Sequence, residues 1–341
     1  MKRAKWVFLA LALTAALGVG LAAGIRAVRP ARRYAQGLAL RAEQRWDEAA
    51  AAFEEAGDHR DAAEQILETR YQQAQTLYAA GDYARAYAAF LQASGYRDAD
   101  EILAGDEHFR QSNEQYTEAT APFRTLGETV SFGRYEQDGD PMNGSEPIEW
   151  IVLDEQDGRA LLISRYGLDC QPFHTRRALV NWGTCSLRSW LNREFLEAAF
   201  DAAECGAVLK TRVDNSRAQG YEKYGASSGS DTQDRVFLLS YAEAWRYFPT
   251  NEARQTTATA YARARGAYTS QQNGNCWWWL RSSGNAGTCA MNVHCSGVRG
   301  DYLAHDPYAA VRPAIWVDLR SPYFSLSGNE TRTGGEDAND A

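Results

Sequence analysis

The chain has 341 residues, of which 45% are hydrophobic and 23% are charged, and these values suit a globular protein with room for two folded units. The formal net charge is −8, but residues 1–33 contain seven Lys or Arg and no acid, which leaves 29 basic and 44 acidic residues and a charge of −15 for the rest. An acidic body lacks the basic surface that phosphates require, so nucleic acid is excluded as a partner.

An uncharged and mostly apolar run of twenty residues extends from Trp6 to Ile25, with basic residues on both sides. An α-helix of this length crosses the roughly 30 Å hydrocarbon core of a bilayer. The run exceeds the usual apolar core of a signal peptide, so retention is favoured over cleavage. We therefore expect residues 1–33 to form a membrane anchor that spans the cell membrane once through residues 6–25. Four arginines after the run favour a cytoplasmic body, but long domains often cross regardless, and we expect an extracytoplasmic one.

The next segment contains an internal repeat. The stretch "WDEAAAAFEEAGDHRDAAE" from Trp46 aligns with "YARAYAAFLQASGYRDADE" from Tyr83 at a period of 37, so that Phe53 matches Phe90. Alanine-rich segments with regularly spaced aromatic residues predict pairs of antiparallel helices. They resemble tetratricopeptide-type repeats, whose usual period is about 34 residues. We expect residues 34–110 to form such repeats, which would serve as a spacer or as a protein-docking surface.

After a predicted linker over residues 111–127, the pattern changes to that of strands. Apolar runs on both sides of Asp157-Gly158 predict a β-hairpin, because these two residues accept the backbone of a tight turn. Helical spacing of apolar residues predicts a helix over residues 186–200, with Ser186 as its N-cap. Further strands are expected over residues 235–240 and 311–319, a short helix over residues 241–248, and a disordered acidic tail over residues 322–341.

Five separated motifs occur in order in this part of the chain: "PIEWIVLD", "SLRSWLN", "DTQDRVFLLSYAEA", "WWLRS" and "VRPAIWV". Together they resemble a bacterial family without established activity, domain-of-unknown-function family 6273, over residues 128–321. A more remote similarity is to the C-type-lectin-like fold, which formylglycine-generating enzymes use. These resemblances imply an α+β domain with a mixed or antiparallel sheet, but a fold does not determine a function.

Three consecutive tryptophans, Trp277 to Trp279, are followed by Leu280. In a strand these side chains alternate between the two faces, and exposing all of them would leave a large apolar patch. The run therefore predicts a strand that is covered on both faces.

The segment 283–310 follows that strand and is rich in Asn, Arg, His, Tyr and Gly. Adaptable polar and aromatic side chains held between fixed strands are typical of binding loops. The lectin-like resemblance implies ligand contacts in the same region. The predicted ligand-binding residues are Asn285, Asn292, His294, Arg299, Asp301, Tyr302, His305 and Tyr308.

No catalytic residue, cofactor or firm metal site is predicted. Asp231 and Asp234 are the only calcium candidates retained, although carboxylates before a strand also anchor loops through hydrogen bonds. The six cysteines are disulfide candidates if the domain lies outside the cell, and reduced thiols otherwise; they are Cys170, Cys185, Cys205, Cys276, Cys289 and Cys295.

The favoured interpretation is a membrane-anchored, non-catalytic recognition protein that binds an extracellular glycan, peptide or protein. The resemblance to formylglycine-generating enzymes implies a rival, a cysteine-dependent oxidase or modifying enzyme that uses Cys289 and Cys295. A third hypothesis is an intracellular adaptor that binds through its helical repeats.

Overall fold

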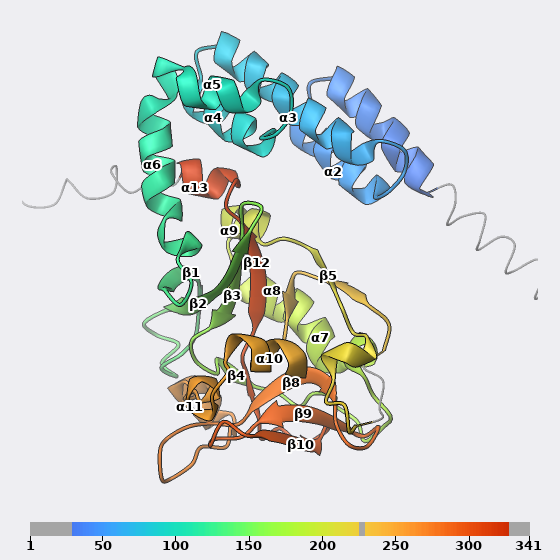
Figure 1. Ribbon diagram of the computed structural model, residues 1–341, viewed down its shortest axis with the longest axis vertical. Coiled ribbons are helices and arrows are strands. Elements are labelled where there is room, and N and C mark those ends of the chain that lie inside the picture. Colours follow the sequence, from blue (N-terminus) through green and yellow to red (C-terminus); the bar gives the residue numbers. More distant parts are fainter. Residues whose placement is uncertain (1–28, 225–228, 327–341) are drawn as a thin grey trace, which may run out of the picture. The chain divides into compact units, whose positions relative to one another are not determined.

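The computed structural model describes residues 29–224 and 229–326, and Figure 1 shows their helices and strands. The chain divides into two compact units, of which the first contains the described residues up to Gln115 together with Ser325 and Leu326, and the second runs from Tyr116 to Phe324. Strands occur only in the second unit within the described ranges. The architecture is therefore α+β, with the helices N-terminal and the sheets C-terminal.

The expected fold class needs one correction, which concerns the transmembrane helix. Within residues 29–224 and 229–326, no helix is long and apolar enough to cross a membrane. Helix α3 (Ala62–Ala79) has 18 residues, but charged side chains such as Glu64, Glu68 and Arg70 lie within it. The run from Trp6 to Ile25, on which the prediction rested, lies outside the described residues.

The first unit consists of helices joined by short turns. Residues 29–42 are helical, and residues 111–127, expected as a linker, are largely helical as well. The remaining elements are α2 (Trp46–Ala56), α3, α4 (Tyr83–Gln92), α5 (Ala99–Gly105), a short 3-10 turn (Glu107–Phe109) and α6 (Arg110–Thr120), which continues into the second unit. The 3-10 turn that follows (Pro122–Arg124) belongs to the second unit.

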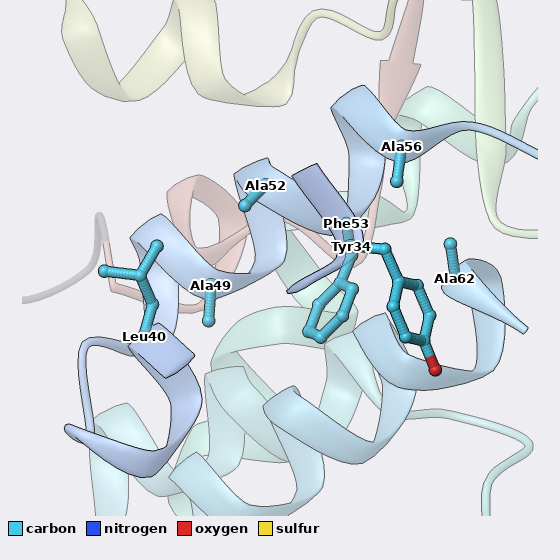
Figure 2. Close-up of a cluster of buried hydrophobic side chains, with 7 residues drawn as sticks. All are labelled: Tyr34, Leu40, Ala49, Ala52, Phe53, Ala56 and Ala62. Carbon is cyan, nitrogen blue, oxygen red and sulfur yellow. The ribbon is translucent and has the colours of Figure 1, made fainter. Parts of the chain in front are cut away.

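The two halves of the 37-residue repeat make the same contacts. The edge of the buried Phe53 ring meets Tyr34 with the centroids 5.5 Å apart, and Phe90 meets Tyr71 at 5.7 Å. Figure 2 shows the first of these clusters, in which alanines surround the two rings. Each tyrosine hydroxyl also donates a hydrogen bond to the aspartate 27 residues later. The sequence repeat is therefore also a repeat of packing.

The second unit contains two five-stranded sheets and one two-stranded sheet. The orders of the larger sheets are β1-β2-β3-β12-β7 and β10-β9-β8-β11-β4, and every pairing is antiparallel except that of β11 with β8. The strands are β1 (Thr129–Tyr135), β2 (Glu146–Gln156), β3 (Arg159–Ser164), β4 (Asp169–Cys170), β5 (Thr211–Val213), β6 (Thr232–Asp234), β7 (Val236–Phe237), β8 (Trp278–Ser283), β9 (Cys289–Val293), β10 (Arg299–Leu303), β11 (Ala310–Val311) and β12 (Ala314–Asp318).

The predicted hairpin is confirmed. Strands β2 and β3 pair across Asp157 and Gly158, whose φ angles are 53° and 73°. Two consecutive positive φ angles are characteristic of the type I′ turn that matches the strand twist.

Other expected elements form with altered limits. The predicted helix over residues 186–200 consists of α7 (Ser186–Trp190), a π-helical turn (Leu191–Phe195) and α8 (Leu196–Ala199). Its N-cap is Cys185 and not Ser186, because the Cys185 sulfur accepts the hydrogen bond from the Arg188 N–H. The other helices of the unit are α9 (Ala202–Ala207), α10 (Tyr241–Tyr247), α11 (Asn251–Arg254), α12 (Ala260–Ala264) and α13 (Pro322–Leu326), which begins within the expected tail.

The two apolar runs predicted as strands are shorter in the sheet than in the sequence. Residues 235–240 contribute only the two residues of β7, because Ser240 then caps α10 by accepting the Glu243 N–H. Residues 311–319 divide into β11 and β12 at Arg312-Pro313, where the chain passes from one five-stranded sheet to the other. Proline has no N–H to offer to a ladder, which accounts for the break.

Candidate functional site

The tryptophan run divides between the core and the surface. Trp278 and Trp279, the first two residues of β8, are fully buried, as predicted. Their indole N–H groups donate to the carbonyl oxygens of Arg254 and Gln171, each at 3.0 Å. Trp277 immediately precedes the strand and is only half-buried. The prediction of a covered strand is therefore right for β8 and wrong for Trp277.

Trp277 belongs to a group of linked rings that we call the aromatic patch: Tyr268, Trp277, His294, Tyr302 and Tyr308. The Trp277 ring stacks on His294 with the centroids 4.3 Å apart and lies 4.8 Å from Tyr268. Tyr302 joins Trp277 at 5.6 Å and Tyr308 at 5.8 Å. Tyr268 and Tyr308 are 43% and 48% exposed, so the patch reaches the surface.

Strand pairing and backbone hydrogen bonds bring these rings together from separate segments of the chain. Strands β8, β9 and β10 lie side by side in that order (Figure 1). His294 follows β9, and its N–H donates to the Val298 carbonyl at 2.8 Å in the turn that leads to β10. The Tyr268 N–H donates to the Tyr308 carbonyl at 2.8 Å, which ties the segment after α12 to the segment after β10.

Gly300 makes room for the polar side chains beneath the patch. It lies opposite Asn292 in the β9–β10 ladder. A Cβ atom at this position would lie 2.4 Å from Asn292 Oδ1 and 2.7 Å from His294 Cδ2. Both distances are shorter than a nonbonded contact allows, so the close approach requires glycine.

Buried polar groups without hydrogen-bond partners lie at this face. Asn292 is completely buried, and neither its amide oxygen nor its amide nitrogen has a partner among the described residues. The same holds for the Trp277 Nε1 atom. Native proteins contain few such groups, because each costs about 1–3 kcal/mol. These groups lie next to the exposed rings of the aromatic patch.

Arg299 and Asp301 point to the other side of β10, since side chains alternate along a strand. The Arg299 guanidinium lies 3.8 Å from the centre of the Tyr221 ring. The Tyr224 hydroxyl donates to Asp301 Oδ1 at 2.8 Å and accepts from Arg299 Nη1 at 3.2 Å. These two predicted residues therefore form a second group, separate from the aromatic patch.

The remaining predicted residues stand apart. Asn285 is exposed in the turn between β8 and β9. His305 is half-buried, with its Nε2 atom 3.5 Å from Asp306 Oδ1. Of the eight predicted ligand-binding residues, the structure thus brings together Asn292, His294, Tyr302 and Tyr308.

The calcium candidates are engaged as loop anchors. Asp234 accepts hydrogen bonds from Trp182 Nε1 at 2.9 Å and Arg188 Nε at 2.6 Å. Asp231 accepts from the Asn215 N–H at 3.0 Å and forms an ion pair with Arg212. These contacts match the anchoring role that was the alternative to calcium binding.

A different acidic group lies in the loop after β1 and at the start of β2. Glu136, Asp138 and Glu146 each place a carboxylate oxygen within 4.8 Å of the others, and all three are at least partly exposed. Clusters of this kind are common on protein surfaces without a bound cation.

The six cysteines have free thiols, with Cys205, Cys289 and Cys295 half-buried. Burial raises the pKa of the Cys170, Cys185 and Cys276 thiols, each to about 12, and also raises the pKa of Cys289. A reactive thiol needs the opposite setting, electropositive and partly exposed, which lowers the pKa.

Residues 157–319, just under half of the chain, match the family described as Domain of unknown function (DUF6273). No curated protein and no solved structure matches the chain. The similarities to the C-type-lectin-like fold and to tetratricopeptide repeats are thus not confirmed. The match begins at the turn between β2 and β3 and includes the whole aromatic patch. The resemblance to this domain family, whose function is unknown, is confirmed over residues 157–319.

Proposed function

We propose that this is a non-catalytic recognition protein, which binds a glycan, a peptide or another protein through the aromatic patch. The observation that carries the proposal is the chain of rings from Tyr268 through Trp277 to Tyr308, exposed at both ends and held by a sheet. Aromatic side chains offer a large, rigid and amphipathic contact area at a small cost in conformational entropy. Joined exposed rings are therefore suited to binding.

The polar groups of the same face complement the rings. The three tyrosine hydroxyls and the His294 imidazole can form directional hydrogen bonds with a ligand. Burial lowers the pKa of His294, so the ring is neutral at pH 7 and offers one donor and one acceptor. The rings are inclined to one another, and a surface of this composition fits the polar and apolar faces of a sugar or of a peptide side chain.

The thiol chemistry supports a binding role over the rival enzymatic one. Cys289, which the remote similarity implied as a catalytic residue, has a raised pKa because it is partly buried. A raised pKa decreases the fraction of thiolate, the form that reacts.

The test is binding of the purified chain to arrays of glycans and peptides. We expect a ligand class to bind to the natural chain and to be lost in the Tyr302→Ala, Tyr308→Ala double variant. Tyr166→Ala provides a matched control, since Tyr166 is half-buried in the same unit and packs with Arg165 outside the patch. Binding that survives in the double variant, or that is lost equally in the control, would remove the patch from consideration.

A further inference from the structure

A second aromatic surface lies on the opposite side of β10. Four half-buried rings form a continuous row, which we call the aromatic ladder: Tyr224, Tyr221, Tyr241 and Trp245. The successive centroids are 5.1, 5.3 and 4.4 Å apart. The first two rings follow a 3-10 turn (Arg217–Gln219), and the last two are on α10.

Helix α10 is fixed against the sheet, so the ladder has a rigid base. The Tyr241 N–H donates to Ser282 Oγ of β8 at 2.9 Å. Glu243 of the same helix forms an ion pair with the fully buried Arg281 of β8. Helix α10 and strand β8, which hold the aromatic ladder, both belong to the domain matched over residues 157–319. The aromatic ladder and the aromatic patch have no ring in common.

Arg299 lies against the Tyr224 and Tyr221 rings of this surface as an exposed cation. Its guanidinium lies 3.8 Å from the centre of the Tyr221 ring and 5.7 Å from that of Tyr224. Stacking on a ring and the hydrogen bond to the Tyr224 hydroxyl fix its orientation. No carboxylate among the described residues forms an ion pair with it.

The neighbouring carboxylate is engaged elsewhere. Asp301 lies two residues after Arg299 on the same side of β10, but it accepts its hydrogen bond from Tyr224. The Tyr224 hydroxyl thus links the two charged side chains and keeps them from pairing directly. No described residue accepts a hydrogen bond from Nε or Nη2 of Arg299. A planar guanidinium with such donors suits a carboxylate.

Two cations and the Asp301 carboxylate lie near the ladder, so the balance of charge favours an anion. Arg299 and the buried Arg254 are the cations that face Tyr241, and Arg254 lies 4.1 Å from the centre of the Trp245 ring. Glu222 and Lys223, one acid and one base, are exposed between the first two rings and offset each other.

We propose that the aromatic ladder and Arg299 form a second binding site, specific for an acidic carbohydrate. Arg299 would receive the carboxylate of a uronic acid, and the half-exposed rings would contact the apolar face of the sugar. This site is independent of the aromatic patch, because it uses other residues on the other side of β10.

The test is a calorimetric titration of the full chain with trigalacturonate and with its methyl ester, which has the same sugar skeleton without the charges. We expect the free acid to bind and the ester to bind at least about tenfold more weakly, since charge-assisted hydrogen bonds are lost. Arg299→Gln should weaken binding of the free acid to a similar degree. Arg299→Lys should have an intermediate effect, because it retains the charge but not the planar fork.

Two controls separate binding at this site from binding at the aromatic patch and from loss of folding. Tyr302→Ala should leave the affinity for trigalacturonate unchanged, and thermal unfolding should show that each variant is folded. The proposal is overturned if trigalacturonate does not bind, if the ester binds as tightly as the acid, or if Arg299→Gln has no effect. It is also overturned if a tri-glutamate peptide binds as tightly as trigalacturonate, because the site would then recognise any carboxylate.

Discussion

Gly300 lies at a position of the β9–β10 ladder where a larger side chain does not fit. Its φ angle is not in the positive region, so its role is steric and not conformational. The space above it is taken up by the Asn292 amide and the His294 ring, both at distances that leave no room for a methyl group. A glycine inside a strand is often a sign of such close approach, but the sequence does not reveal which side chains approach it.

Gly300→Ala should therefore destabilise the second unit by about 1–3 kcal/mol, the usual cost of overpacking. Urea unfolding followed by tryptophan fluorescence measures this change. Gly206→Ala is the control, because Gly206 lies in α9 with no atom within 4 Å of the added Cβ. Alanine in a helix stabilises by roughly 0.5–1 kcal/mol relative to glycine. Equal effects of the two substitutions would contradict the close approach at Gly300.

At the scale of single elements, the sequence is sufficient to predict those turns and helices whose formation depends on neighbouring residues. The turn at Asp157-Gly158 and the helices of the repeat can be predicted, since turn residues and apolar periodicity determine both. The end of the strand within residues 235–240 cannot be predicted, because Ser240 caps a helix where the apolar pattern predicts that the strand continues. The choice between the two depends on tertiary packing.

The hairpin offers a test at this scale. Gly158→Ala should destabilise the second unit by about 1–2 kcal/mol, since a residue with a Cβ disfavours the left-handed conformation. The new Cβ would meet only ordinary contacts with Arg320 from 3.5 Å, so the effect would come from the backbone. Asp157→Asn is the control and should be nearly neutral, because asparagine also accepts a positive φ. A neutral Gly158→Ala in urea unfolding would show that the turn is not as described.

Because the two halves of the helical repeat pack alike, equivalent substitutions in them should destabilise the first unit to a similar degree. Phe53→Ala and Phe90→Ala should each destabilise the first unit by about 3–5 kcal/mol, because both rings are buried against an equivalent tyrosine. Circular dichroism during urea unfolding measures both. If one substitution had a large effect and the other almost none, the two halves would not be equivalent in packing.

At the scale of the whole molecule, the candidate site depends on contacts that sequence does not reveal. Tyr268 and Tyr308 are 40 residues apart, and a backbone hydrogen bond joins them. The tryptophan pattern places Trp277 in the core with the rest of its run, since nothing in the run marks where β8 begins. The composition of segment 283–310 predicts a binding region, but its residues divide between two faces of β10, and only strand register reveals this division.

The thiols provide a test of the non-catalytic assignment for the molecule as a whole. In the native protein at pH 7, we expect Cys205, Cys289 and Cys295 to react with maleimide and the three buried cysteines to react only after unfolding. Burial raises the pKa of those three to about 12, which leaves almost no thiolate. Mass spectrometry of the labelled peptides gives the order in which the cysteines react. A thiol that reacts much faster in the native than in the unfolded chain would favour the enzymatic alternative.

The most direct test of recognition through the aromatic patch is ¹⁹F NMR of the protein labelled with 5-fluorotryptophan. Trp277 is half-buried in the aromatic patch, whereas Trp278 and Trp279 are fully buried beside it. The Trp277→Phe variant identifies the Trp277 resonance. On titration with the ligand found on the arrays, we expect this resonance to shift and those of Trp278 and Trp279 to stay in place. A saturating ligand that leaves the Trp277 resonance unshifted would contradict recognition through the aromatic patch.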